Sequence, residues 1–163
     1  MEVVPFRPEF ASQVLDLILD IQRNEFGMTI SAEQQPDLTR IPSFYQIRAG
    51  NFWVAIAEDA VVGTISLLDI GSSQGALRKM FVQREYRGAG RGTATRLLDA
   101  LIAWSATRGV RDVFLGTTPH FLAAHRFYAK HGFREIARST LPPTFPIMEV
   151  DTKFFHRRVE TAI

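Results

Sequence analysis

The sequence predicts an α+β fold: a mixed, mostly antiparallel sheet of about six to seven strands flanked by helices. Three observations lead to this prediction. Strand-like and helix-like runs follow one another in irregular order, a glycine-rich segment at 88–92 joins a strand-like run to a helix-like one, and 46% of the 163 residues are hydrophobic against 22% charged. Such a length and composition are typical of one compact core. We therefore expect a single domain over residues 1–163.

The first fifty residues predict a short strand followed by helices. Residues 3–6 read as a strand, and apolar residues recur at helical spacing over 9–24. A second helical stretch is expected over 31–49, interrupted by Pro36 and Pro42. This region carries fewer specific signals than the rest of the chain.

The middle of the chain predicts three antiparallel strands. Residues 52–58 and 61–69 flank Asp59-Ala60 and read as a hairpin, and the run 76–82 follows the small, polar turn 71–75. The order of these runs favours neighbours in one sheet.

The second half predicts a strand–helix–strand unit and a closing pair of strands. A helix from Thr93 to near Gly109 precedes a strand at 110–116, which should lie parallel to the strand before the helix. A helix around Tyr128 then leads to strands at 133–136 and 147–154, with a proline-rich loop between them.

The glycine-rich segment is the strongest functional signal. Arg87, Gly88, Ala89, Gly90, Arg91 and Gly92 follow the strand-like run Met80-Phe81-Val82 and precede a helix that opens at Thr93. Glycines let backbone N–H groups approach an oxyanion closely, and a helix N-terminus adds positive partial charge. The segment therefore predicts a binding site for a phosphate or pyrophosphate group.

Spacing separates this segment from two better-known phosphate loops. The glycines run G-x-G-x-G, whereas a dinucleotide fingerprint requires a third glycine where Thr93 stands, and a P-loop ends in Gly-Lys-Ser/Thr. The alternative interpretation is a glycine-rich turn with two solvated arginines.

A second motif lies about forty residues further on. Phe127 and Tyr128 are followed by Gly132 and Phe133 at the end of an amphipathic helix. Together with the glycine segment, this pattern resembles the GCN5-related N-acetyltransferases (the GNAT family), and the resemblance extends over about residues 50–155. It implies the acyl-CoA N-acyltransferase fold, in which the strands on either side of the glycine loop splay apart and acetyl-CoA enters the gap.

The resemblance also implies roles for individual residues. The backbone of Met80, Phe81 and Val82 would bind the pantetheine amides and the oxyanion, and the segment from Arg87 to Thr93 would bind the pyrophosphate. Tyr128 would be the general acid, because a phenol stays protonated at neutral pH and can protonate a thiolate. The alternative is that Tyr128 only packs at the end of its helix. Arg84, Arg126 and Lys130 are further candidates for phosphate contacts.

Two positions depart from the family pattern. Phe121 stands where the family often has an asparagine, and the strand before the loop has Gly75-Ala76-Leu77 where a glutamate often serves as the base. The general base is therefore not identified by the resemblance. Three residues are candidates for this role instead: Glu25, Asp69 and His120.

Composition restricts the remaining functions. The chain has no cysteine, so disulfides, cysteine nucleophiles and thiolate metal sites are excluded, and its histidines lack the spacing of a metal site. The formal charge of +2 is spread along the chain and predicts no nucleic-acid partner, and no apolar run is long enough to predict a membrane span. We expect a cytoplasmic protein. The apolar Phe154-Phe155 pair suits either a homodimer contact or a buried C-terminal strand within the monomer.

The predicted function is acetyl transfer from acetyl-CoA to a primary amine by direct attack on the thioester. The acceptor, a small molecule or a peptide, is not readable from the sequence. One alternative is a non-catalytic acyl-CoA-binding sensor or regulatory module. Another is a nucleotide-phosphate binder unrelated to acetyl transfer.

Overall fold

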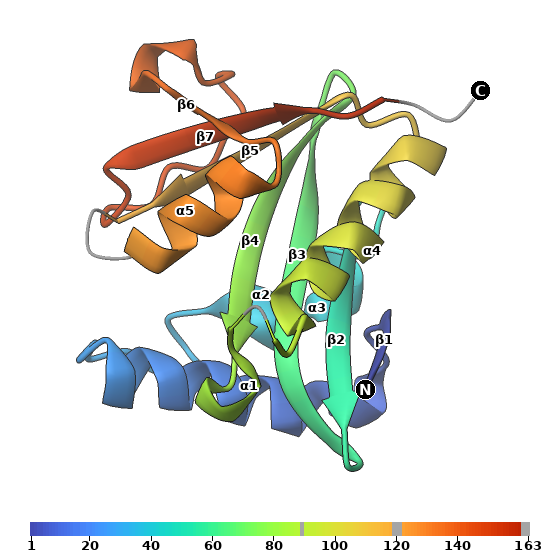
Figure 1. The fold of residues 1–163 in the computed structure, drawn as a ribbon, viewed down its shortest axis with the longest axis vertical. Coiled ribbons are helices and arrows are strands. Elements are labelled where there is room, and N and C mark those ends of the chain that lie inside the picture. The colour runs from blue at the N-terminus through green and yellow to red at the C-terminus, as the bar shows by residue number, and fades with distance from the viewer. Residues whose placement is uncertain (89, 119–121, 161–163) are drawn as a thin grey trace.

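One seven-stranded sheet organises the fold (Figure 1). The structure is a computed structural model that describes residues 1–88, 90–118 and 122–160. In order across the sheet the strands are β1 (Glu2–Pro5), β2 (Asn51–Ala57), β3 (Ala60–Gly71), β4 (Gln74–Val82), β5 (Asp112–Thr117), β7 (Lys153–Arg158) and β6 (Arg134–Ile136). Neighbouring strands are antiparallel except β4 and β5, which are parallel. The expected mixed, mostly antiparallel sheet is confirmed.

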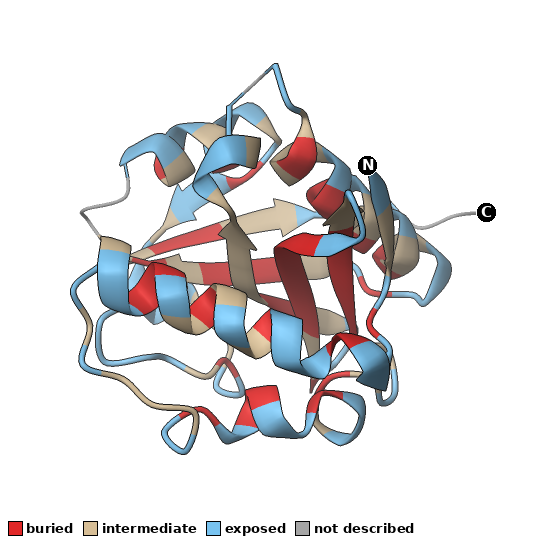
Figure 2. Ribbon diagram, turned by 90° about the horizontal axis from the view of Figure 1, so that it is seen from below, coloured by how far each residue is buried: buried red, intermediate tan, exposed pale blue. Residues whose placement is uncertain are grey.

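Helices cover both faces of this sheet. The helices and helical turns, in chain order, are η1 (Pro8–Phe10), α1 (Ala11–Asp20), η2 (Ile21–Glu25), α2 (Pro36–Thr39), α3 (Ile41–Phe44), η3 (Arg84–Tyr86), α4 (Thr93–Thr107), α5 (Leu122–Lys130) and η4 (Arg138–Thr140). Successive residues of β2 point to opposite faces: Phe52 packs with α1 and α3, and Trp53 packs with α4. In Figure 2 the buried positions follow the strands and the inward sides of the helices.

Two segments differ from what the sequence predicts. The helical stretch expected over 31–49 is two single-turn helices, because Pro36 and Pro42 stand in the first turns of α2 and α3 and start them. The strand expected over 147–154 begins only at Lys153, since the residues before it form a turn closed by the Asp151 N–H on the Met148 carbonyl, 3.0 Å away. The apolar side chains that favoured a strand there are exposed: Ile147, Met148 and Val150.

The parallel pair β4 and β5 separates after a short contact. Their register ends at Ala76 and Phe114, although β4 continues to Val82 and β5 to Thr117. Beyond that point β5 pairs only with β7. Figure 1 shows the two strands diverging, with α5 in front of the β5 side. We refer to the space between them as the β4–β5 gap.

Candidate active site

A bulge in β4 lies where the strand borders the β4–β5 gap. On β3, Thr64 is opposite Phe81 and Ser66 is opposite Arg78, so one residue of β3 faces two of β4. Lys79, inside the bulge, has a φ of 53°. The bulge leaves backbone groups of β4 without partners in the regular ladder.

Two buried hydroxyls take the place of ladder hydrogen bonds at the bulge. The Thr64 hydroxyl donates to the Lys79 carbonyl and the Ser66 hydroxyl donates to the Arg78 carbonyl, each over 2.7 Å. Both hydroxyl-bearing residues are 0% exposed. These bonds fix the shape of the strand beside the gap.

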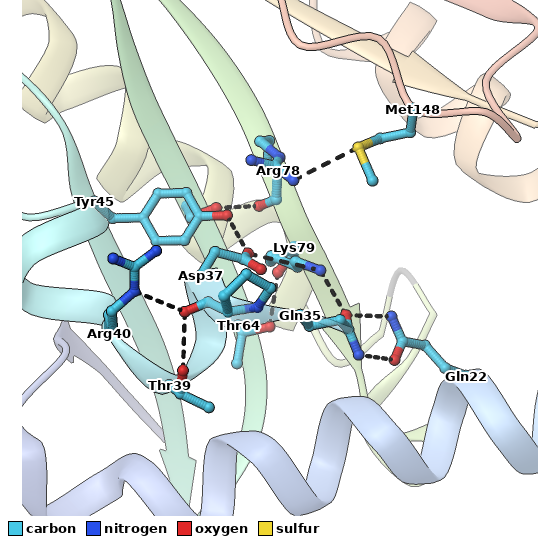
Figure 3. Close-up of polar contacts among 12 residues, drawn as sticks. Gln22, Gln35, Asp37, Thr39, Arg40, Tyr45, Thr64, Arg78, Lys79 and Met148 are labelled. Atoms are coloured by element: carbon cyan, nitrogen blue, oxygen red, sulfur yellow. Dashed lines mark hydrogen bonds and ion pairs between the residues drawn. The ribbon is translucent and has the colours of Figure 1, made fainter. Parts of the chain in front are cut away.

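A buried polar network anchors the Lys79 side chain on the face covered by α1 to α3 (Figure 3). The Lys79 ammonium donates to Gln35 Oε1 over 2.6 Å and lies 3.7 Å from Asp37 Oδ2, which also accepts from the Tyr45 hydroxyl over 2.7 Å. Gln35 exchanges two amide hydrogen bonds with Gln22. Burial lowers the pKa of the Lys79 ammonium and raises that of the Tyr45 hydroxyl. The network connects η2, α2 and α3 to the bulge.

The glycine loop between β4 and α4 has two glycines that its backbone requires. Gly88 has a φ of 97°, and Gly92, the N-cap of α4, has a φ of 69°. Gly90 is different: a Cβ added there would have no heavy atom of the described residues within 4 Å, apart from its own chain neighbours. No packing neighbour among the described residues explains this glycine, which fits a loop that a ligand approaches from outside. Ala89 lies outside the described residues.

The other predicted loop residues are held by contacts of their own. Arg87 donates to the Val82 carbonyl over 2.7 Å and pairs with Glu25, also at 2.7 Å. Arg91 is exposed and its guanidinium stacks on the Tyr86 ring, 5.4 Å from the centroid. Thr93 is buried. Arg91 is therefore the loop cation whose charge faces solvent.

Tyr128 reaches from α5 to β4. Its hydroxyl lies 3.6 Å from the Met80 sulfur, a weak acceptor, and its ring packs against Phe133 and Phe155. Burial raises the pKa of the hydroxyl, so it remains protonated at neutral pH. The structure thus brings Tyr128 to the predicted strand segment, where Met80, Phe81 and Val82 are half-buried.

The described candidates for the general base are engaged elsewhere. Glu25 pairs with Arg87 and, at 3.7 Å, with Arg84, and the hydrogen bond from Arg87 lowers the pKa of its carboxyl. Asp69 accepts from the Ala49 and Gly71 N–H groups at the β3–β4 turn, away from the bulge. His120 and Phe121 lie outside the described residues.

Sequence reasoning missed two charged residues that flank the gap on the face of the sheet opposite Tyr128. Arg78 lies one residue before Lys79 on β4, and Asp151 lies in the turn before β7, packed over Gly116 of β5. The exposed Arg126 and Lys130 lie on α5. A strand prediction over 147–154 concealed Asp151, and a break in the alternation of apolar residues there is the signal that could have revealed it.

Two further sequence expectations concern metals and membranes. Across the ranges that the structure describes, no three His, Asp or Glu side chains gather in a way that could hold a metal ion. No helix in the same ranges is long and apolar enough to cross a membrane.

Phe154 and Phe155 are buried in β7, inside the sheet, so they form no exposed apolar edge.

A glycine loop at a helix N-terminus lies beside two diverging strands, which is the arrangement that the resemblance to the acyl-CoA N-acyltransferase fold implies. The sequence model of the acetyltransferase (GNAT) family matches residues 15–133, well over half of the chain. The chain belongs to this family.

Relatives and solved structures agree with this assignment. The chain is similar to the N-acetylaspartate synthetase of Danio rerio, 32% identical over 111 residues, which is 65% of this chain and 39% of the relative. It is also similar to the human N-acetyltransferase 8B, 24% identical over 90% of this chain and 66% of the relative. The chain thus spans about two fifths to two thirds of the length of these relatives.

Among solved structures, the fold matches bacterial acetyltransferases over nearly its whole length. A GNAT-family acetyltransferase from Staphylococcus aureus MU50 superposes with a TM-score of 0.91 and 36% identity, covering 98% of this chain and 99% of that one. An acetyltransferase from Streptococcus agalactiae 2603 gives a TM-score of 0.90 and 28% identity over 97% and 98% of the two chains.

Proposed function

We propose that the protein transfers the acetyl group of acetyl-CoA to an amine by direct attack on the thioester, without an acyl-enzyme intermediate. The observation that carries the proposal is the position of Tyr128, whose hydroxyl lies 3.6 Å from the Met80 sulfur beside the β4–β5 gap. Its raised pKa keeps the phenol protonated at neutral pH, so the hydroxyl is present as a hydrogen-bond donor when a thiolate leaves.

The co-substrate would lie between the glycine loop and the gap. Gly88, Gly90 and Gly92 and the N-terminus of α4 would bind the pyrophosphate, with Arg91 beside them. The backbone of Met80, Phe81 and Val82, which faces no β5 partner, would donate and accept hydrogen bonds along the pantetheine and stabilise the oxyanion. The open position at Gly90 supports this arrangement.

The acceptor is proposed to be a small amine. The names of the N-acetylaspartate synthetases, which match 61% to 65% of this chain, favour an amino-acid-like acceptor over a protein lysine.

The proposal extends to a single domain over residues 1–163, since strands from both ends of the chain belong to one sheet.

A coupled assay tests the transfer directly. The purified protein is mixed with acetyl-CoA and a panel of free amino acids, polyamines and peptides with free N-termini. The release of the CoA thiol is followed over time, and the mass of the amine product is measured at the end. We expect amine-dependent thiol release and an acetylated amine. Binding of acetyl-CoA without transfer to any acceptor would instead support the non-catalytic sensor.

A further inference from the structure

Arg78 and Asp151 lie on the same face of the sheet, on opposite sides of the β4–β5 gap. The last paired residues of the two strands, Ala76 and Phe114, belong to one apolar cluster and so share a face. Arg78 and Gly116 each follow one of them by two positions and point the same way. Asp151 packs directly over Gly116, where an added Cβ would lie 2.5 Å from its Oδ2 atom.

This face is the one opposite Tyr128. The Arg78 guanidinium lies 5.9 Å and 6.0 Å from the ring centroids of Phe44 and Tyr45, at and just beyond the end of α3. Tyr128 belongs to the core cluster on the other side of the sheet, with α4. An acceptor that enters between Arg78 and Asp151 would therefore approach the gap from the side away from α5.

The positive charge of Arg78 has no carboxylate in contact within the part of the chain that the structure describes. Its guanidinium donates to the Met148 sulfur over 3.7 Å (Figure 3), and a thioether is a weak acceptor. Two aromatic rings lie near the guanidinium, and apart from the bond to Met148 it donates no hydrogen bond within the described residues, so most of its five N–H donors are available. Arginine presents these donors in a planar fork that matches a carboxylate.

Asp151 is a carboxylate suited to accept a proton. It accepts one hydrogen bond, from the Met148 N–H over 3.2 Å, and its burial raises the pKa of the carboxyl. The positive charge of Arg78, on β4, acts on this carboxyl from another element and lowers its pKa, but by less than burial raises it. On its own segment Glu149 is exposed, and Lys153 pairs with Glu135 at 3.4 Å.

We propose that Arg78 and Asp151 form the acceptor subsite, in which Arg78 binds a carboxylate of a zwitterionic amine and Asp151 takes a proton from its ammonium. This inference rests on the proposed acetyl transfer. The class of acceptor is a free amino acid or a related amino acid derivative with an unblocked carboxylate. Val150, next to Asp151 in the sequence, and Ile147, at the start of the same segment, have exposed side chains.

The proton balance of the step is complete. The ammonium gives one proton to Asp151, and the neutral amine forms a C–N bond to the thioester carbonyl carbon. When the C–S bond breaks, the thiolate takes the proton of Tyr128, and the second amine proton restores the phenol. Asp151 then releases its proton to solvent, so that the net products are the N-acetyl compound, CoA and one proton.

The pH dependence of Asp151→Asn distinguishes a proton acceptor from a structural residue. Asparagine keeps the shape and an oxygen for the Met148 N–H, but the amine must then arrive already neutral. We expect kcat/KM at neutral pH to fall by about 10²- to 10⁴-fold, and the deficit to shrink about tenfold per pH unit as pH rises toward the pKa of the amine. The matched control, Glu149→Gln, changes an exposed carboxylate of the same turn and should leave the profile unchanged. A deficit that does not vary with pH would overturn the role of Asp151.

The second experiment examines Arg78 with paired acceptors. Wild type and Arg78→Gln are assayed with the common L-amino acids and with their α-amides, in which the α-carboxylate is neutral. We expect wild type to prefer at least one free amino acid over its amide. In the variant, KM for that amino acid should rise at least tenfold, whereas KM for the corresponding amide should stay near the wild-type value. No preference for a carboxylate, or one that survives in the variant, would overturn the subsite.

These outcomes separate the subsite from the proposed function. Acetyl transfer to amines without any effect of the carboxylate contradicts the subsite alone. If acetyl-CoA binds, as judged by a raised thermal midpoint, but no member of the panel is acetylated, both the subsite and the transfer are contradicted.

Discussion

Tyr128 illustrates how a single buried residue can serve packing and chemistry together. Its ring belongs to the core with Phe133 and Phe155, yet its hydroxyl points to β4, where its partner among the described residues is a thioether. A buried hydroxyl with a weak acceptor contributes little to stability. The polar atom is thus better explained by the reaction than by the fold.

The prediction at this position concerns Tyr128→Phe. We expect kcat to fall by about 10²-fold or more, because the departing thiolate loses its proton donor, while the affinity for acetyl-CoA and the thermal midpoint stay nearly unchanged. Steady-state kinetics with a ligand-dependent melting curve measure all three quantities. An unchanged kcat would show that Tyr128 only packs.

Individual residues differ in how far the sequence reveals them. Gly88 and Gly92 were recognisable because their spacing and type suit a loop before a helix, and the structure gives both a positive φ. The pairing of Arg87 with Glu25 was not recognisable, since the two residues are 62 positions apart and meet only after η2 packs beside β4. Asp151 was hidden in the same way, by a turn that local hydrophobicity did not reveal.

At the scale of elements, the bulge in β4 links the fold to the site. It occurs where β4 leaves β5, and it is held on one side by hydroxyls of β3 and on the other by the buried Lys79 network. A strand without the bulge would present its backbone groups differently to the gap. The shape of the gap is therefore a property of three elements together.

Thr64→Val tests this link. The change removes the hydroxyl that donates to the Lys79 carbonyl while keeping the side-chain volume, and we expect the free energy of unfolding to fall by about 1 kcal/mol and kcat to fall as the bulge relaxes. Urea unfolding and steady-state kinetics give the two values. Thr144→Val, at an exposed loop position, is the control. Loss of stability with unchanged kcat would mean that the bulge has no part in catalysis.

Most elements were predictable from local patterns, and the exceptions have physical causes. Helix α4 follows a strong helical periodicity of apolar residues. The hairpin of β2 and β3 follows two strand-like runs joined by a short turn, whose residues have positive φ. The sequence predicts one interrupted helical stretch over 31–49, because prolines usually break the interior of a helix. In the structure the two prolines instead stand in the first turns of two short helices. The separation of β4 from β5 came only from the family resemblance, because strand pairing is set by distant segments.

For the whole molecule, buried ionisable groups set how stability depends on pH. Burial raises the pKa of both Tyr45 and Tyr128 in the folded protein above the value of about 10 in the unfolded chain. A raised pKa of an acid means that the folded state binds more protons, so this contribution is fully present below about pH 10 and is lost as pH rises above it. The lowered pKa of Lys79 acts in the opposite sense, since stability from that group increases up to about pH 10.4.

We therefore predict that the thermal midpoint falls between about pH 10 and pH 11.5, and that it falls less steeply in Tyr45→Phe, which has lost one of the two buried phenols. Scanning calorimetry over this range gives both slopes, and one cooperative transition would also support a single domain. An equal slope in the two proteins would show that Tyr45 does not control the alkaline limit.

The central claim is that the glycine loop binds the pyrophosphate of acetyl-CoA, and Gly90 allows the most direct test of it. The measurement is the thermal midpoint of wild type and of Gly90→Val, each with acetyl-CoA, CoA, ATP and NAD. Because no atom of the described residues, apart from the chain neighbours of Gly90, lies within 4 Å of the added Cβ, the unliganded midpoints should differ little. Wild type should be stabilised by acetyl-CoA and CoA, with about 2.7 kcal/mol gained at a hundredfold excess over Kd, and the variant should lose that gain. No shift with either compound, an equal shift with ATP or NAD, or a full shift in Gly90→Val would contradict the account.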